Sequence, residues 1–331
     1  MKHIFRSLLF VFAAALLLAA CEVEFSPNAE YKETPVIYCL LDQDDDTVWV
    51  RVERCFLEEG NIYDYGSDPE LINYPQGTIS VTLSAWRNGG MVSSILLDDT
   101  LRAHETGLFA SVPQPIYYTT VPLDTTCMYK LEVRRTDDGT LLAYTDSIPL
   151  ILQTESTLIT RPSNVTAFGF NESNNGSASC QIAWNRMQNA RRYQPIVRFF
   201  YGENGDTLHV DLPCNSVVNP PFTTSYTRNA FLYGIKEALK DDPAPKTYLK
   251  FVEIYLTACD ENLNVYLRSV ASGTSMNQTS DTYTNIHGGM GIFAARRIHL
   301  YKYLRADSSM NPLNSGNPGL LAYLQDLGVG F

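Results

Sequence analysis

Short stretches in which apolar and polar residues alternate constrain the fold of this chain more than any other feature. In the stretch that begins at Val48, valines at 48, 50 and 52 fall on one face, whereas Trp49, Arg51 and Glu53 fall on the other. A repeat of two residues is that of a β-strand with one buried face. Comparable stretches recur between Gly, Pro and Asn residues, and 20 Tyr and 15 Phe also favour strands. The pattern predicts a mainly β protein.

The first half of the chain reads as a series of hairpins. Asn-Gly and Asp-Gly dipeptides favour tight turns between antiparallel strands. The expected strand pairs are 35–41 with 48–56 across an acidic turn, 79–86 with 91–97 across Asn88-Gly89-Gly90, and 128–134 with 141–145 across Asp137-Asp138-Gly139. This spacing is typical of a β-sandwich. We therefore predict an N-terminal sandwich domain over residues 35–150.

Residues 151–305 are predicted to form a second β domain that contains helices. Trp184 ends a strand pattern, and Tyr193 begins the next one, which resembles the B and C strands of fibronectin type III domains. Apolar stripes after Asn229 and Asp260 predict helices near 230–240 and 260–271. A last strand is expected over 292–304, and residues 306–331 form a tail with a short helix. The predicted fold is thus two Ig- or fibronectin III-like sandwiches with a few inserted helices and a C-terminal helix.

The N-terminus reads as an export signal. Lys2 and Arg6 precede an apolar run that ends in Leu18-Ala19-Ala20-Cys21 and is too short to span a bilayer permanently. The pattern resembles a bacterial lipoprotein signal, in which the cysteine is acylated and becomes the first mature residue. We expect removal of residues 1–20, lipid on Cys21 and a polar tether over 21–34. An ordinary secreted protein, cut by chance before a cysteine, is the alternative.

The net charge narrows the classes of partner, and the cysteines bear on disulfides and on the core. The net charge is −11, which argues against a nucleic-acid partner because such binding needs clustered Lys and Arg. Six cysteines remain besides Cys21, without a Cys-x-x-Cys motif, so their pairing is left open. Cys39 and Cys180 lie within apolar strand patterns, and we predict that both are core residues.

Three motifs match functional patterns only in part. Asp42, Asp44 and Asp46, with Glu53 at the twelfth position, follow the calcium spacing of an EF-hand loop. Thr47 stands where that loop needs Gly, and a strand follows where a helix should begin. We therefore expect a solvated acidic hairpin tip and retain a calcium site as a weak alternative.

The other two motifs lie near the C-terminus. Gly289-x-Gly291-x-x-Ala294 fits a dinucleotide fingerprint by letter, but a strand is expected after it instead of a helix, so the glycines are read as a tight bend. His287-Gly288-Gly289 has no accompanying Gly-x-Ser-x-Gly nucleophile motif. We expect neither catalysis nor a cofactor. Paired carboxylates stay open as a route to glycoside hydrolysis.

Aromatic residues in loops are candidates for binding. Tyr63, Tyr65 and Tyr74 lie in or beside a long loop over 58–77, and Tyr117-Tyr118 lie in a later stretch. Tyrosine offers an apolar ring with a polar end, which suits contact with a sugar or a protein partner. We retain the long loop as a candidate contact surface beside the structural reading, because tyrosines are also common in β-sandwiches.

Several stretches together carry a family resemblance. Residues 34–42, 50–57 and 60–61, with the helix from Asp260 and the stretch 283–293, resemble a group of Bacteroidetes surface lipoproteins of unknown function. The resemblance implies an outer-membrane lipoprotein of two β-sandwich-like units beside a TonB-dependent transporter. Glu22 and Glu24, separated by Val23, match the phylum's surface-export signal incompletely, which leaves the membrane face open.

The expected function follows from these features. We expect a lipid-anchored, non-enzymatic binding or accessory protein of the outer membrane that partners a transporter. A fimbrillin-like structural adhesin or pilin subunit is the alternative, because such proteins also begin as lipoproteins with two β-rich domains. An enzyme is the third class considered.

Overall fold

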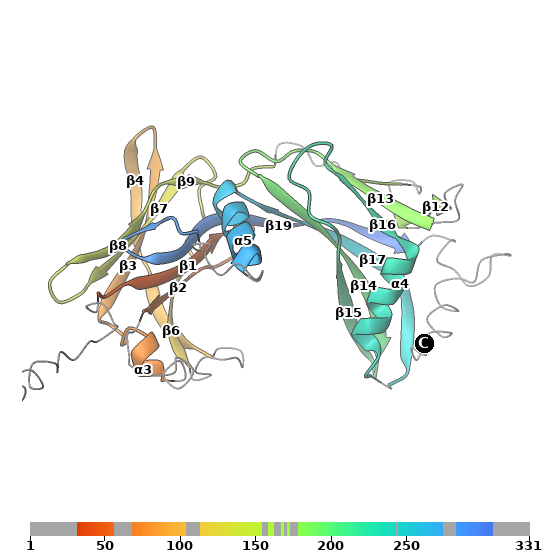
Figure 1. The fold of residues 1–331 in the computed structure, drawn as a ribbon, viewed down its shortest axis with the longest axis horizontal. Coiled ribbons are helices and arrows are strands. Elements are labelled where there is room, and N and C mark those ends of the chain that lie inside the picture. The colour runs from red at the N-terminus through yellow and green to blue at the C-terminus, as the bar shows by residue number, and fades with distance from the viewer. Residues whose placement is uncertain are drawn as a thin grey trace, which may run out of the picture.

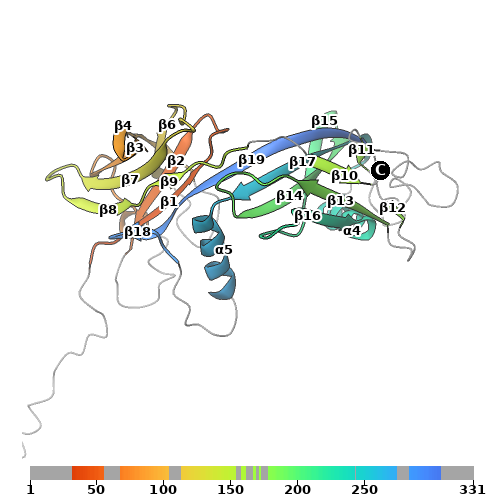
Figure 2. The ribbon, with the colours of Figure 1, turned by 90° about the horizontal axis from the view of Figure 1, so that it is seen from above.

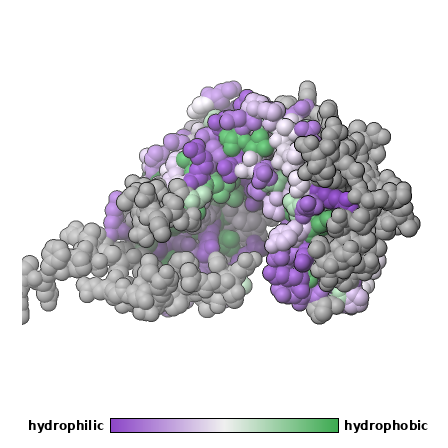
Figure 3. All heavy atoms as spheres, turned by 45° about the vertical axis from the view of Figure 1, so that its right-hand side comes forward, coloured by the Kyte–Doolittle hydropathy of each residue, from purple (hydrophilic) through white to green (hydrophobic). Residues whose placement is uncertain are grey.

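The computed structural model describes residues 32–55, 68–103, 113–153, 158–161, 167–168, 171–172, 178–242, 244–273 and 283–306. These residues form two strand-rich bodies placed end to end (Figures 1 and 2). The expectation of a mainly β fold with few helices is confirmed. Hydrophilic side chains predominate on the face drawn in Figure 3, with small apolar clusters between them. Within the described ranges, no helix is both long and apolar enough to cross a bilayer.

The first body is a sandwich of two sheets. One sheet orders its strands β19-β1-β2-β6-β5, and the other orders them β18-β8-β7-β3-β4, with β9 beside β7. The bounds are β1 Pro35–Leu41, β2 Val48–Arg54, α3 Pro69–Ile72, β3 Ile79–Arg87, β4 Gly90–Leu96, β5 Asp98–Arg102, β6 Gln114–Thr119, β7 Met128–Arg135, β8 Leu141–Thr145, β9 Ile148–Pro149 and β18 Ile286–His287. The three predicted hairpins form, because alternation and turn residues agree there.

The second body packs a large sheet against a small one and a helix. The large sheet orders β15-β14-β17-β19, and β13 lies between β10, β12 and β16 in the small one. The bounds are β10 Leu158–Arg161, β11 Ala167–Phe168, β12 Asn171–Glu172, β13 Ala178–Trp184, β14 Arg192–Glu203, β15 Asp206–Pro213, β16 Thr223–Thr227, α4 Arg228–Leu239, β17 Lys246–Cys259, α5 Glu261–Gly273 and β19 Met290–Ala306. Trp184 and Tyr193 are both buried, and their ring centroids are 5.8 Å apart.

The two long helices lie where the apolar stripes predict them. Asp260 begins α5 as expected, with its Oδ1 accepting a hydrogen bond from the amide of Leu263 at 2.9 Å. The cap of α4 is Thr227 instead of Asn229, because the hydroxyl of Thr227 accepts from the amide of Ala230 at 3.2 Å. The predicted C-terminal helix lies outside the described residues.

Strand β19 belongs to both bodies. Met290 to Ala295 pair in parallel with β1, and Arg296 to Arg305 pair antiparallel with β17. The sequence places residues 286–305 entirely in the second domain, yet β18 pairs with β8 and the start of β19 completes the first sandwich. Alternation predicts a strand here, but it does not specify which sheet accepts it.

The cysteines are buried or partly buried. Cys39 and Cys180 are core residues, as predicted. The described ranges include all six cysteines other than Cys21, and no disulfide joins any of them.

Gly291 permits the close approach of β19 to β1. Its φ is +103°, and a Cβ on it would collide with the carbonyl oxygen of Ile37. We expect Gly291→Ala to lower the free energy of unfolding by about 3 kcal/mol, from backbone strain and lost pairing. Gly90→Ala is the matched control, because the nearest atom to its Cβ is 3.7 Å away. Chemical denaturation of both variants checks this, and equal stabilities would contradict it.

Candidate functional site

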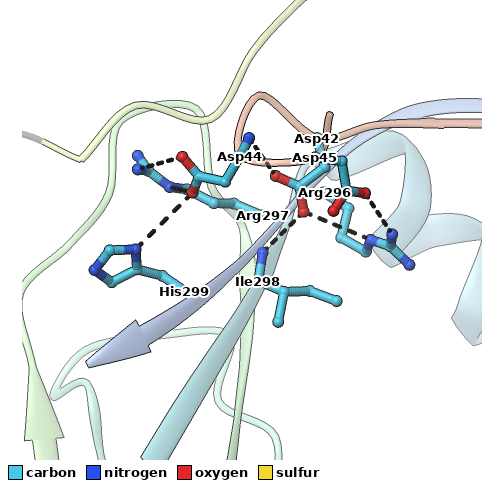
Figure 4. Close-up of polar contacts among 7 residues, drawn as sticks. All are labelled: Asp42, Asp44, Asp45, Arg296, Arg297, Ile298 and His299. Carbon is cyan, nitrogen blue, oxygen red and sulfur yellow. Dashed lines mark hydrogen bonds and ion pairs between the residues drawn. The ribbon is translucent and has the colours of Figure 1, made fainter. Parts of the chain in front are cut away.

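The acidic turn between β1 and β2 docks against β19. Asp44 pairs with Arg297 at 2.8 Å, and Asp45 with Arg296 at 3.5 Å (Figure 4). His299 also faces this turn, with its Nδ1 3.9 Å from Asp44 Oδ2. Asp44, Asp45 and Asp46 are exposed, as expected of a solvated tip, although two of them also pair with cations on β19. The charges of Asp44 and Asp45 are paired with cations on β19, about 250 residues later in the sequence. Such a pairing cannot be detected from the sequence around the turn.

Asp42 is the buried member of this turn, with 2% of its surface exposed. Its Oδ2 accepts from the amide of Ile298 at 3.0 Å, and its Oδ1 accepts from the amide of Asp44 at 3.1 Å. Both bonds satisfy backbone amides that lie beyond the last residue of β1, where that strand no longer supplies acceptors. Of the weak calcium candidates, Asp42 and Asp44 are thus engaged in contacts within the protein, and Asp46 is exposed to solvent. Among the described residues, no group of side chains is placed to hold a metal ion.

Asp260 has the same role on the opposite edge of β19. Its Oδ2 accepts from the amide of Ala295 at 3.1 Å, just beyond the end of β17. Burial raises the pKa of both Asp42 and Asp260, and the backbone hydrogen bonds oppose that rise. Burial, followed by the charge of Arg297, lowers the pKa of His299. This cluster is therefore a structural joint between the two bodies.

A second cluster offers a surface to a ligand. Trp49 on β2 is 37% exposed, and its ring lies 5.3 Å from that of Tyr118 on the neighbouring β6. The guanidinium of Arg102 on β5 lies 4.9 Å from the centroid of the Trp49 ring. The three residues, which we call the aromatic–arginine surface, come from three adjacent strands of the first sandwich. Exposed aromatic and arginine side chains are enriched where proteins bind partners.

A pocket adjoins this surface at the end of β5. It has a volume of about 90 Å³ and is lined by Arg51, Arg102, Ala103, Gln114, Pro115 and Ile116. Arg51 forms an ion pair with Glu53 and donates to Oε1 of Gln114 at 3.2 Å. The pocket thus presents two guanidinium groups beside an indole ring, an arrangement suited to binding and not by itself to catalysis.

The residues predicted for binding do not form one site in the part of the chain that the structure describes. Tyr63, Tyr65 and the lipidation residue Cys21 lie outside the described residues. Tyr74 is 4% exposed and Tyr117 2%, so both are core residues and offer no contact surface. The sequence analysis missed Trp49 and Arg102 as binding residues. The alternation around Val48 places Trp49 on the outer face, but the position of Arg102 depends on pairing between β5, β6 and β2.

Comparisons with known proteins give a distant structural similarity and no match in sequence. No family model matches the chain, and no curated protein matches it. Among solved structures, the chain is similar to the FN1-FN3 domains of chicken CNTN1, with 8% sequence identity and a TM-score of 0.25. The match covers 70% of this chain and 61% of that chain, which is less than two thirds of the latter.

The raised pKa of Asp42 predicts a pH-dependent effect of Asp42→Asn. Between about 3.9, the value in an unfolded chain, and the higher folded pKa, the folded carboxyl holds more protons. The stability that Asp42 contributes therefore falls as pH rises through this window. Asn does not titrate, so we expect the substitution to cost more stability at pH 4 than at pH 7.

Urea denaturation at both pH values measures this difference. Asp46→Asn is the control, because Asp46 is exposed on the same turn and should have little effect at either pH. A larger cost at pH 7 than at pH 4 would show that the buried carboxylate is stabilised by its charge.

Proposed function

We propose that the chain is a lipid-anchored, non-enzymatic binding protein of the outer membrane that acts beside a transporter. The aromatic–arginine surface of Trp49, Tyr118 and Arg102 carries this proposal, because it combines ring contacts with an exposed cation on one sheet face. The lipoprotein-like signal that ends at Cys21 supports the anchor, and the resemblance to Bacteroidetes surface lipoproteins supports the location.

The position of the tether supports a partner in the same membrane. The first described strand, β1, begins at Pro35 and belongs to the sandwich that carries the aromatic–arginine surface. Fourteen residues from Cys21 to Thr34 reach about 50 Å at most when fully extended. A lipid on Cys21 would therefore hold this surface within reach of a membrane protein, and tethering would raise the effective concentration of that partner.

The anchor is tested by Cys21→Ser. Metabolic labelling with an alkyne fatty acid should mark the wild-type protein and leave the variant unmarked, because serine lacks the thiol that is acylated. The variant should also be absent from the outer-membrane fraction. Cys55→Ser is the control and should retain both label and location. Label on the Cys21→Ser protein would overturn the proposed anchor.

The binding surface is tested by photo-crosslinking in cells. A photoreactive phenylalanine in place of Trp49 should crosslink to an outer-membrane transporter, identified by mass spectrometry. The control replaces Tyr233, which is 61% exposed on α4 of the second body. A transporter crosslink at position 49 alone supports the proposal. Equal crosslinks at both positions, or none at position 49, would count against it.

A further inference from the structure

Two guanidinium groups meet at the pocket beside the aromatic–arginine surface. Arg51 lies on β2 and Arg102 on β5, and β6 runs between these two strands in the sheet. The volume of about 90 Å³ is enough for a carboxylate group, although it is smaller than a site that encloses a whole drug-sized ligand. Gln114 and Ile116 add an amide and an apolar side chain to the lining. The pocket is therefore built from polar groups that converge on a small volume.

The charge of this pocket differs in sign from that of the chain. The net charge of the chain is −11. Arg51 is paired with Glu53, but no described carboxylate lies within ion-pair distance of Arg102. Two guanidiniums and one carboxylate leave a local surplus of positive charge. Such a surplus attracts an anion, and the low-dielectric walls of a pocket strengthen that attraction.

The ring of Trp49 orients the guanidinium of Arg102 for contact with a planar anion. Its guanidinium lies over Trp49 at 4.9 Å, which restricts the guanidinium to a few orientations. A stacked guanidinium keeps its N–H edges available, and their fork matches the two oxygens of a carboxylate. Arg51 is held in place by Gln114 at 3.2 Å. Both cations are thus oriented before a ligand arrives, which reduces the entropy lost on binding.

A second basic surface on the same sandwich lacks these features. Lys130 lies 4.5 Å from the centroid of the Trp86 ring, and Arg87 lines the same pocket. Arg87 pairs with Asp124 at 2.6 Å. Its charge is therefore neutralised within the protein. Lys130 offers a point charge without the planar fork of an arginine.

We propose that the pocket of Arg51 and Arg102 binds the carboxylate of a small organic acid. Arg102 receives the two oxygens, Arg51 supplies the second cation, and Trp49 lies beside the apolar part of the ligand. This inference rests on the proposed function, since it names the ligand class of the same surface. A sugar acid and the free carboxyl end of a peptide share this chemistry.

Calorimetric titration of the full lipidated chain in detergent tests the proposal at pH 7. The probes are galacturonate, N-acetylglycine and neutral galactose. Saturable binding of at least one acid, and weaker binding of galactose, is expected. Arg102→Met should weaken binding of that acid about tenfold or more, because a hydrogen-bonded charge is lost. Arg102→Lys should weaken it less, since the charge remains but the fork does not.

Arg134→Met is the matched control. Arg134 lies on β7 of the opposite sheet, where it pairs with Glu132 at 3.0 Å, and its loss should leave binding unchanged. Binding of galacturonate alone identifies a sugar acid, and binding of N-acetylglycine alone identifies a peptide carboxyl; binding of both shows that the carboxylate suffices. Equal binding of galactose and galacturonate, or no binding of either acid, overturns the carboxylate inference. A transporter crosslink at position 49 would still uphold the proposed function in that case.

Discussion

The transfer of β19 from one sheet to the other is the constraint on which the rest of the structure depends. A strand that changes neighbours leaves backbone amides without partners at the crossing, and an unsatisfied buried amide costs about 1–3 kcal/mol. Two buried carboxylates take these positions. Asp260 accepts from Ala295 on the side of β17, and Asp42 accepts from Ile298 on the side of β1. A buried carboxylate therefore accepts a backbone amide at each edge of the strand where its neighbour changes.

The same crossing joins the hydrophobic cores. One continuous cluster of buried side chains extends from Ile37 and Leu83 in the first sandwich to Phe199 and Phe231 in the second. Leu152 and Gln188 exchange two backbone hydrogen bonds of 3.1 and 2.8 Å near the same place. Two sandwiches linked only by a loop would move independently, whereas a shared strand and a shared core couple their unfolding.

Local features of the sequence predicted local structure. The β1–β2 hairpin, the Asn88-Gly89 turn and the stripe of α4 follow from periodicity and turn chemistry, which act over a few residues. The pairing of β1 with β19 joins residues about 250 positions apart, and no local pattern encodes it. For the same reason Asp42 appeared as a candidate metal ligand. Its carboxylate accepts from the amide of Ile298 on β19, and the local sequence does not show that β19 lies beside it.

The β1–β2 hairpin combines three roles that appear separate in the sequence. Its first strand continues from the tether, its turn holds Asp42 against β19, and its second strand presents Trp49 seven residues later. Trp49 directly follows Val48, which is buried in the core, so the indole is fixed by the same packing that fixes the joint. A ligand bound at Trp49 and Arg102 would therefore stabilise β2 and, through the turn, the crossing of β19. Because such coupling is reciprocal, loosening the Asp42 contacts should also weaken binding at the surface.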